Sequence, residues 1–198
     1  MNTLWTIGIL HLSNKPNRIA SYNLLVNELQ KQIQNCNASD IVEIVTETDN
    51  GENSVGKKRN NLLSKAKGEY VCFIDDDDMV TDIYVSHIVK ALQNKPDVVE
   101  LVGFLPHHNL PFIHNLVCGG HFRKDGIQYR TPNHLNTIKT EIARKIGYKE
   151  ISHGEDQDYS HRLWDSGLMK TEELIGKRMY IYQFNPKTSE TTKFAGKR

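Results

Sequence analysis

Over its first 105 residues the chain alternates short apolar segments with longer segments of helical periodicity, and this alternation restricts its fold more than any other feature. Four segments are short, apolar and rich in β-branched or aromatic residues, as expected of buried strands: 4–10, 41–45, 70–74 and 98–104. Three segments between them have apolar residues at helical spacing: 18–36, 55–67 and 81–94. Strands that alternate with helices in this way predict an α/β fold with a mainly parallel sheet.

Capping residues mark the ends of two of these helices. Ser54 and Thr81 have hydroxyl side chains, which are preferred at a helix N-cap, and Gly68 is suited to the position just after a helix end. We therefore expect Ser54 and Thr81 to begin the second and third helices, and Gly68 to follow the second.

After residue 105 the chain is rich in Pro, His and Gly, which predicts loops that form a substrate wall beside the sheet. The pair Asp125-Gly126 predicts a hairpin turn. Three further elements are expected: a helix over 137–146 ended by Gly147, a helix over 155–166 ended by Gly167, and a strand over 178–184. No repeat or linker divides the sequence, so we predict one domain with a flexible polar tail over 185–198.

The composition limits the functions that such a fold can serve. The chain has 198 residues, with 25 Lys and Arg against 24 Asp and Glu, so it lacks the strongly basic balance of a protein that coats DNA. The cysteines, Cys36, Cys72 and Cys118, form no CxxC pair and predict neither a disulfide framework nor a zinc site. No apolar run approaches the ~20 residues that span a bilayer. We expect a protein of the reducing cytoplasm, that of the host cell if the protein is viral.

The sharpest local feature is a run of four carboxylates, Asp75 to Asp78, directly after the predicted strand 70–74. Like charges this close repel one another, so the arrangement needs compensation. A cation, Mg²⁺ or Mn²⁺, held by one or two carboxylates and completed by substrate phosphate oxygens would supply it. The alternative is a solvated acidic turn that caps the next helix. Ligands of parallel sheets bind outside the carboxyl ends of the strands, where Asp49 is also predicted to lie, and this favours the metal.

Basic residues open the second predicted helix, in the sequence Gly56-Lys57-Lys58-Arg59. Cations beside a helix N-terminus suit a diphosphate. Arg59 is the strongest candidate, because its planar fork binds a phosphate or the Asp49 carboxylate through paired hydrogen bonds. Lys57 and Lys58 are equally consistent with a solvated helix face.

A third polar segment, HGEDQDYSHRL from His153 to Leu163, opens the predicted helix over 155–166. Glu155 and Asp156 lie in its first turn, where the helix dipole favours an ionised carboxylate. Taken alone, the pair is consistent with an acidic cap. On the far wall of a nucleotide and metal pocket, an ionised carboxylate is what a general base needs to accept a hydroxyl proton.

Two of these segments together resemble a known family. SVGKKRNNLLSKAKGEYVCFIDDDD, residues 54–78, and GEDQDYSHRLWDSG, residues 154–167, are similar to the family 2 glycosyltransferases of GT-A fold. The resemblance implies a Rossmann-like fold of the nucleotide-diphospho-sugar transferases. It assigns residues 1–105 to a half that binds the nucleotide sugar, and 106–184 to an acceptor and catalytic half of the same domain.

The resemblance also implies roles for the acidic residues. It places Asp75 and Asp76 near the ribose and uracil of the donor, and Asp77, with Asp75, on the metal. It makes Asp156 the catalytic base, with Glu155 in support.

Four further residues are implied to bind the nucleotide. Asp49 recognises the base, Arg59 is its partner, and Lys58 adds positive charge near the diphosphate. His11 lines the nucleotide pocket, although the chain has His-Leu-Ser-Asn where the family has Pro-Thr-Tyr-Asn after the first strand.

A looser match to small phage-type and bacterial members covers residues 129–151. It makes His134 and Asn136 candidates for contacts with the donor or acceptor sugar. A loop histidine bonded to backbone groups is the alternative for His134.

The implied reaction is metal-dependent transfer, with inversion, of a hexose or pentose from a nucleotide diphosphate donor, a UDP-sugar, to an acceptor hydroxyl. Two alternatives stay open: a nucleotidyltransferase of related fold and a non-catalytic metal-binding interaction module. The acceptor is equally open, because the loops that would select it are the least readable part of the sequence. Saccharide, glycolipid, protein and modified DNA base all fit.

Overall fold

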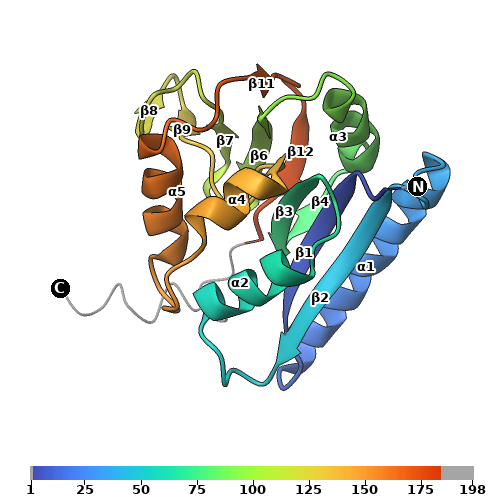
Figure 1. Ribbon diagram of the computed structural model, residues 1–198. Helices are drawn as coiled ribbons and strands as arrows, with labels where there is room; N and C mark the ends of the chain where they lie inside the picture. Colours follow the sequence, from blue (N-terminus) through green and yellow to red (C-terminus); the bar gives the residue numbers. More distant parts are fainter. Residues whose placement is uncertain (1, 184–198) are drawn as a thin grey trace.

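Two six-stranded sheets organise residues 2–183, the part of the chain that the computed structural model describes (Figure 1). The first sheet has the order β11-β5-β10-β3-β1-β2. Its strands are β1 (Trp5–Leu12), β2 (Val42–Asp49), β3 (Tyr70–Asp75), β5 (Val98–Val99), β10 (Ile138–Lys139) and β11 (Glu172–Glu173). Among these six strands only β10 runs against its neighbours, so the predicted α/β fold with a mainly parallel sheet is confirmed.

The second sheet replaces most of the loops that the sequence predicted after residue 105. It has the order β4-β12-β6-β7-β9-β8 and mixes parallel and antiparallel pairs. Its strands are β4 (Met79–Val80), β6 (Leu101–Leu105), β7 (Leu110–His114), β8 (Phe122–Lys124), β9 (Ile127–Arg130) and β12 (Arg178–Ile181). A 3₁₀ helix, Pro106–His108, connects β6 to β7.

The predicted strand over 98–104 is divided between the two sheets at Glu100. The buried Glu100 carboxylate accepts hydrogen bonds from the backbone N–H groups of Ile175 (3.0 Å) and Gly176 (2.7 Å) and from Asn115 Nδ2 (3.0 Å). A buried carboxylate needs such donors. Glu100 therefore interrupts the apolar run, and β5 stays in the first sheet while β6 joins the second.

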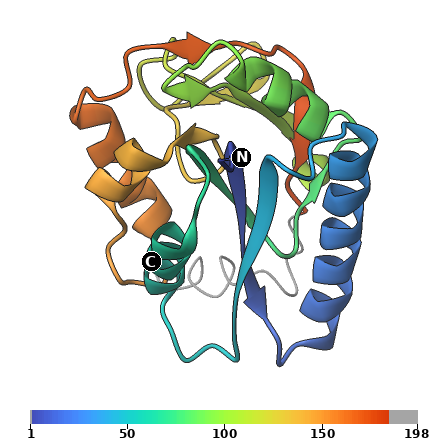
Figure 2. The ribbon, with the colours of Figure 1, turned by 45° about the vertical axis from the view of Figure 1, so that its right-hand side comes forward.

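Helices cover both faces of the first sheet (Figure 2). Helices α1 (Pro16–Asn35) and α3 (Tyr84–Leu92) lie on one face, and α2 (Val55–Lys65), α4 (Thr140–Ile146) and α5 (Glu155–Asp165) on the other. No helix within residues 2–183 combines the length and the apolar character that a bilayer crossing requires.

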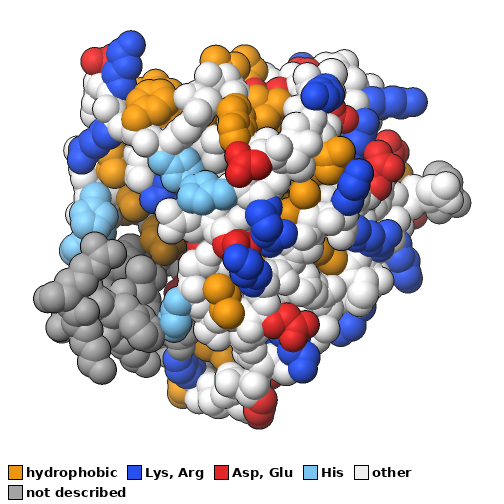
Figure 3. Space-filling model, turned by 60° about the vertical axis from the view of Figure 1, so that its left-hand side comes forward, with side chains coloured by type: hydrophobic (Ala, Val, Ile, Leu, Met, Phe, Trp, Pro, Cys, Tyr) orange, Lys and Arg blue, Asp and Glu red, His pale blue; other side chains and the backbone are white. Residues whose placement is uncertain are grey.

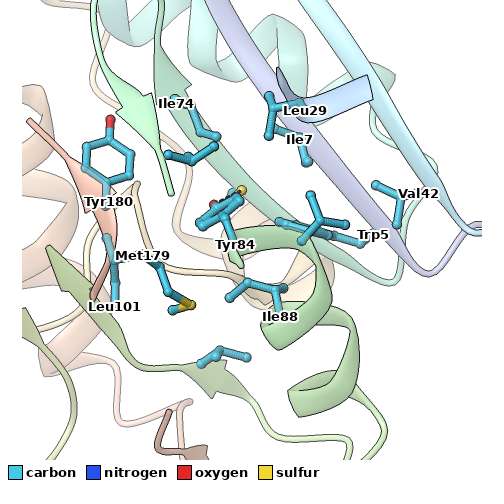
Figure 4. Packing of buried hydrophobic residues seen from close by; sticks show 14 of the residues in the cluster. Trp5, Ile7, Leu29, Val42, Ile74, Tyr84, Ile88, Leu101, Met179 and Tyr180 are labelled. Carbon is cyan, nitrogen blue, oxygen red and sulfur yellow. Dashed lines mark hydrogen bonds between the residues drawn. The ribbon is translucent and has the colours of Figure 1, made fainter. Parts of the chain in front are cut away.

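The side chains of β3 alternate between two cores because both faces of its sheet are covered. Cys72 and Ile74 enter the core shared with α1, α3 and the second sheet, where Figure 4 shows Ile74 and Tyr84 among the labelled side chains. Val71 and Phe73 enter the core shared with α2, α4 and α5. The strand that precedes the acidic run is thus fixed from both sides.

The capping predictions have mixed outcomes. Ser54 caps α2 as predicted, and its Oγ accepts a hydrogen bond from the Lys57 N–H (3.3 Å). Thr81 does not cap α3, whose N-cap is Ile83, because the Thr81 hydroxyl donates to the carbonyl of Arg178 in β12 (3.2 Å). Gly68 is not the residue that ends α2, which has its C-cap at Ala66.

Gly68 serves a different purpose, which is close backbone contact. A Cβ at this position would lie 2.5 Å from the backbone nitrogen of Thr6 in β1. Only a glycine lets the two backbones approach this closely.

The predictions for the last third of the chain are largely confirmed. The hairpin turn Asp125-Gly126 joins β8 and β9 with φ values of 51° and 76°. Gly147 and Gly167 end α4 and α5 with positive φ. Helix α4 begins at Thr140, later than predicted, because the residues before it form β10. The last strand is β12, and the predicted tail over 185–198 lies outside the described residues.

Candidate active site

A pocket of about 660 Å³ lies at the carboxyl ends of β1 and β3, and residues from all three polar segments line it. Its carboxylates are Asp75, Asp77, Glu155 and Asp156, and its basic side chains are Arg18, Lys58, Arg59 and Arg130. Several histidines add to the lining, and Figure 3 shows histidine side chains gathered on one face of the molecule. The predicted convergence of the acidic and basic segments is therefore observed.

The four aspartates divide into an open pair and a buried pair. Asp75 and Asp77 line the pocket, and 29% of each side chain is exposed. Asp76 and Asp78 are 0% and 2% exposed and do not line it. The two carboxylates available to a ligand are thus two residues apart.

Asp76 holds the end of β1 and the start of α1 from behind the pocket. Its Oδ2 bonds to His11 Nδ1 (2.8 Å) and to the Leu12 backbone N–H (3.0 Å), and its Oδ1 forms an ion pair with Arg18. The His11 ring stacks on Tyr22 with 4.1 Å between centroids. Neither Asp76 nor His11 reaches the pocket surface, so each can act on a ligand only through Arg18 and the neighbouring backbone.

Asp78 fixes the opposite side of the acidic turn. It accepts hydrogen bonds from the Tyr180 hydroxyl (2.6 Å) and from the Gln183 backbone N–H (2.7 Å). Burial raises the pKa of Asp78 well above its usual value, and the charges of Asp75 and Asp77 add to this effect.

Asp77 lines the pocket and forms an ion pair with Arg18. Burial raises the pKa of Asp77 to about 6, in spite of Arg18, with Asp75 and Asp76 acting in the same direction as burial. A second cation beside Asp77 would relieve this accumulation of negative charge.

Arg59 connects the acidic run to the start of α5. Its Nη1 donates to Glu155 Oε1 (2.5 Å), its Nη2 donates to Asp75 Oδ1 (3.3 Å), and the guanidinium lies 5.6 Å from the centroid of the Tyr148 ring. Although burial opposes its charge, Asp75 and Glu155 hold the pKa of Arg59 above its usual value. Burial would also raise the pKa of Asp75, but His134 and Arg59 hold it well below its usual range.

The expected pairing of Arg59 with Asp49 is wrong, because Lys58 takes that position. Lys58 Nζ donates to Asp49 Oδ1 at 2.9 Å, and both side chains are buried. Successive residues of a helix point about 100° apart, so Lys58 and Arg59 reach different partners. Asp49 also accepts from the backbone N–H groups of Gly51 (3.2 Å) and Asn53 (3.0 Å).

Asp49 thereby shapes the loop that follows β2 instead of lining the pocket itself. Gly51 and Asn53 of this loop do line it. Burial would raise the pKa of Asp49, but the bonds from Lys58, Asn53 and Gly51 hold it below its usual value.

The start of α2 is occupied by protein groups. The Gly56 N–H donates to the carbonyl of Ile151 (3.0 Å), and the Lys57 N–H is bonded to Ser54. Lys57 is exposed and outside the pocket. The Gly56 and Lys57 N–H groups of this helix end therefore already have protein partners, and the positive charge in the pocket comes from side chains.

Glu155 and Asp156 differ sharply although they are neighbours in the first turn of α5. Glu155 is 5% exposed and bonded to Arg59. Asp156 lines the pocket, is partly exposed, and has no hydrogen bond or ion pair to any residue within 2–183. The geometry thus leaves Asp156 open to a ligand and uses Glu155 to fix the helix start.

The structure settles the places of the two residues from the looser match. His134 lines the pocket with its Nε2 3.8 Å from Asp75 Oδ2. Asn136 is 1% exposed, and its Nδ2 donates to the carbonyls of Val99 and His114 (both 3.0 Å). Asn136 holds strands together and does not reach the pocket.

Among the ionisable pocket residues that the sequence does not predict as site residues are Arg18, His108, His114 and Arg130. Arg18 lies in a predicted helix, and the other three fall in the segment predicted as loops. The signal that could have identified Arg18 is its position: it follows the turn after β1, at the sheet edge where the acidic residues lie. Burial lowers the pKa of His114 to about 3, and the charge of Arg130 contributes, so this ring is neutral.

The residues present fit a metal that is shared with a substrate. Within residues 2–183 no three His, Cys, Asp or Glu side chains are grouped as ligands. Mg²⁺ and Mn²⁺ are commonly held by one or two carboxylates and completed by phosphate oxygens. Asp75 and Asp77 meet this requirement, and a cation held by protein groups alone does not fit them.

Comparison with known proteins agrees with the geometry. The sequence profile of the family described as "Glycosyl transferase family 2" matches residues 26–153. No curated protein sequence matches the chain. Among solved structures, S. aureus TarS 1-349 in complex with UDP-GlcNAc has a TM-score of 0.62 and 13% identity, covering 97% of this chain and 61% of that one.

Two further TarS structures give the same result. S. aureus TarS 1-349 has a TM-score of 0.63 and 17% identity, covering 91% of this chain and 60% of that one. TarS 1-349 in complex with UDP has a TM-score of 0.59 and 16% identity, covering 93% of this chain and 61% of that one. The chain spans about 60% of the length of these structures, and identities this low establish the fold alone. With its profile match over more than half of its length, the chain belongs to glycosyl transferase family 2 and has a GT-A fold.

Proposed function

We propose that this chain transfers a hexose or pentose from a UDP-sugar to an acceptor hydroxyl, with inversion at the anomeric carbon. One observation carries the proposal: a single pocket brings together two groups of charged side chains. The accessible carboxylates of Asp75 and Asp77 lie there beside basic side chains, and the carboxylate of Asp156 lines the same pocket from α5. The family supports the reaction class, and the TarS structures solved with UDP-GlcNAc and with UDP support the donor class.

Asp77 and Asp75 would hold Mg²⁺ or Mn²⁺ together with the donor diphosphate. When bound, the cation neutralises the negative charge that grows on the departing diphosphate. Arg18, Lys58 and Arg59 line the same pocket, and their fixed positive charge stabilises the same group.

The nucleotide would lie near Asp75 and the loop after β2. In this proposal Asp49 acts by fixing that loop and Lys58. His11 and Asp76 act by fixing the end of β1 and Arg18, since both are buried behind the pocket surface. Residues 1–105 thus form the half that binds the donor.

Asp156 is proposed as the general base of the second half, residues 106–184. Its carboxylate takes the proton of the acceptor hydroxyl while that oxygen forms a bond to the anomeric carbon. The bond from that carbon to the diphosphate breaks on the opposite face, and UDP leaves with the electron pair. Glu155 supports the step through Arg59, which ties the start of α5 to the donor wall.

The test is a screen of UDP-sugars with Mn²⁺ in which the released nucleotide is identified. Release of UDP, together with thermal stabilisation by UDP and Mn²⁺, is the expected result. Release of pyrophosphate when UTP and a sugar 1-phosphate replace the UDP-sugar would instead indicate a nucleotidyltransferase. A rise in melting temperature with Mn²⁺ alone, and no further rise with UDP, would indicate a non-catalytic metal-binding module.

The metal assignment has a separate test. Asp77→Ala is expected to lose Mn²⁺-dependent UDP binding, whereas Asp82→Ala, which removes an exposed carboxylate just outside the run, is expected to keep it. UDP affinity that is unchanged by Asp77→Ala and by a chelator would contradict the assignment.

A further inference from the structure

Arg130 differs from the other arginines and lysines that line the pocket in its charge balance. Arg18 is paired with Asp76 and Asp77, Lys58 with Asp49, and Arg59 with Glu155 and Asp75: three cations, each with its carboxylate. Arg130 has no ion pair with any carboxylate within residues 2–183. The positive charge of Arg130 is therefore left for a ligand to balance.

Neutral groups hold Arg130 in place. In the amide orientation that satisfies both side chains, the Gln128 oxygen accepts hydrogen bonds from Arg130 Nε (3.0 Å) and Nη2 (2.8 Å). The carbonyl of Arg130 accepts from the Asn115 N–H (3.1 Å) and from Cys118 Sγ (2.8 Å). The guanidinium is thus oriented without being neutralised, and Nη1 keeps both of its N–H groups.

Arg130 lies on the side of the pocket that carries Asp156. It ends β9, and the next residue, Thr131, bonds through its hydroxyl to Ser160 of α5 (2.9 Å), the helix that begins with Glu155 and Asp156. His121 bonds to the same Thr131 hydroxyl (3.0 Å). Burial first, and then the charge of Arg130, lowers the pKa of His121, while Asp156 acts in the opposite direction.

A second, outer hollow of about 390 Å³ also has Arg130 in its lining. Gln128 and Arg130 line both hollows, so the two share a wall. The remaining lining of the outer hollow is basic, aromatic or apolar and includes no carboxylate: Leu110, His121, Phe122 and Arg123. The Phe122 ring is 44% exposed and stacks on Tyr129 with 4.9 Å between centroids. A molecule that extends from the pocket along this path meets two arginines, Arg130 and Arg123, and no carboxylate.

We infer that Arg130 binds an oxyanion that the acceptor carries near its reacting hydroxyl, and that the acceptor continues into the outer hollow. A phosphate and a carboxylate both match the planar fork of an arginine. The inference rests on the proposed function and adds to it the chemical class of the acceptor. The donor diphosphate is the other oxyanion in the reaction, but its proposed cations lie at Arg18, Lys58 and Arg59.

The experiment compares three acceptors that differ in one group: glucose, glucose 6-phosphate and glucuronate. Each is tested with Mn²⁺ and the best UDP-sugar for UDP release above the rate in water, and for binding by calorimetry to protein saturated with UDP and Mn²⁺. Wild type is expected to bind an anionic member about tenfold or more tightly than glucose, since hydrogen bonds to charged groups are strong. The better of the two anions identifies the group as phosphate or carboxylate.

Variants separate the contact from a general charge effect. Arg130→Gln is expected to abolish the preference for the anion without weakening UDP binding. Arg130→Lys is expected to keep part of the preference for the anion, because lysine retains the charge but not the planar guanidinium. Lys124→Gln, an exposed cation on the same hairpin that lines neither hollow, is the matched control and should behave as wild type.

Two results would overturn the inference. One is that wild type binds neither anion, or binds both no better than glucose. The other is that Arg130→Gln weakens UDP binding, which would assign Arg130 to the diphosphate. Failure of the proposed function is distinguishable from both, because then no UDP-sugar is hydrolysed and UDP itself does not bind.

Discussion

Arg59 donates a 2.5 Å hydrogen bond to Glu155, a residue 96 positions later in the chain, and joins the donor wall of the pocket to the helix that presents Asp156. The same guanidinium bonds to Asp75 at 3.3 Å. Two segments that looked independent in the sequence are therefore one electrostatic unit. Movement of either carboxylate is resisted by the other, because they share one buried cation.

Arg59→Gln is expected to destabilise the fold and disable the site together. The substitution leaves Glu155 and Asp75 near one another without the buried cation, and breaking a buried ion pair from one side costs about 3–5 kcal/mol. Urea unfolding of the variant beside Lys57→Gln, an exposed cation of the same helix, measures the effect. Equal midpoints for the two variants would show that the pair contributes little.

Asp156→Asn is expected to lower the transfer rate and leave donor binding intact. General base catalysis contributes about 10²–10⁴-fold, and the amide cannot accept the proton. The measurements are UDP release with acceptor present and UDP affinity by calorimetry. Asp165→Asn replaces an exposed acid near the other end of α5 and should retain full activity. Asp156 is not the base if its variant keeps a wild-type rate.

The fold could be predicted from the sequence where apolar strand segments alternate clearly with helices. The segments around β1, β2 and β3 are apolar on both faces and are separated by helices, and this order defines a parallel sheet. The second sheet lacked such a signal. In β7, every second side chain is buried: Leu110, Phe112 and His114. However, Pro111 and the histidines near this segment are typical of loops, so the sequence predicts a loop there.

The sequence predicts which charged residues gather at the sheet edge, but it does not predict which of them form ion pairs with one another. Sequence position placed Asp49, Arg59 and Asp75 at one sheet edge. In the structure Arg59 pairs with Asp75, and Asp49 pairs with Lys58, the residue before Arg59. Which cation pairs with which acid depends on helix rotation, since Lys58 and not Arg59 points at Asp49. Arg130 could not be found, because its distinction is that no carboxylate within residues 2–183 forms an ion pair with it, which a sequence does not record.

Glu172 is expected to make the fold less stable at neutral pH than in mild acid. Burial raises the pKa of Glu172 to about 7, with Glu100 acting in the same direction and the bond from the Leu116 N–H (2.8 Å) opposing it. Between the ordinary value of 4.5 and about 7 the folded chain binds more protons at this site than the unfolded chain does. The free energy of unfolding therefore falls as the pH rises through this window.

Glu172→Gln removes that proton linkage and keeps an oxygen to accept from Leu116. We expect the variant to be more stable than wild type at about pH 8, with the difference shrinking towards about pH 4, in urea unfolding across this range. Glu173→Gln, the next residue of β11, is the control that makes the same change of side chain on the same strand. A difference that is constant with pH would contradict the proposed cause.

Gly56→Ala is expected to disturb the site without touching any charged group. A Cβ at residue 56 would lie 1.8 Å from the carbonyl oxygen of Lys149, which is backbone, so α2 or the chain over 149–151 must move. Overpacking of this kind costs about 1–3 kcal/mol. The movement would also lengthen the contact between Arg59 and Glu155, since α2 carries one and the chain after 151 leads to the other. The midpoint temperature of thermal unfolding and the rate of UDP release should both fall. Gly120→Ala, with nothing within 4 Å of the added Cβ, should leave both unchanged. Wild-type stability of Gly56→Ala would mean that the loop yields freely and that this close approach does not set the position of α5.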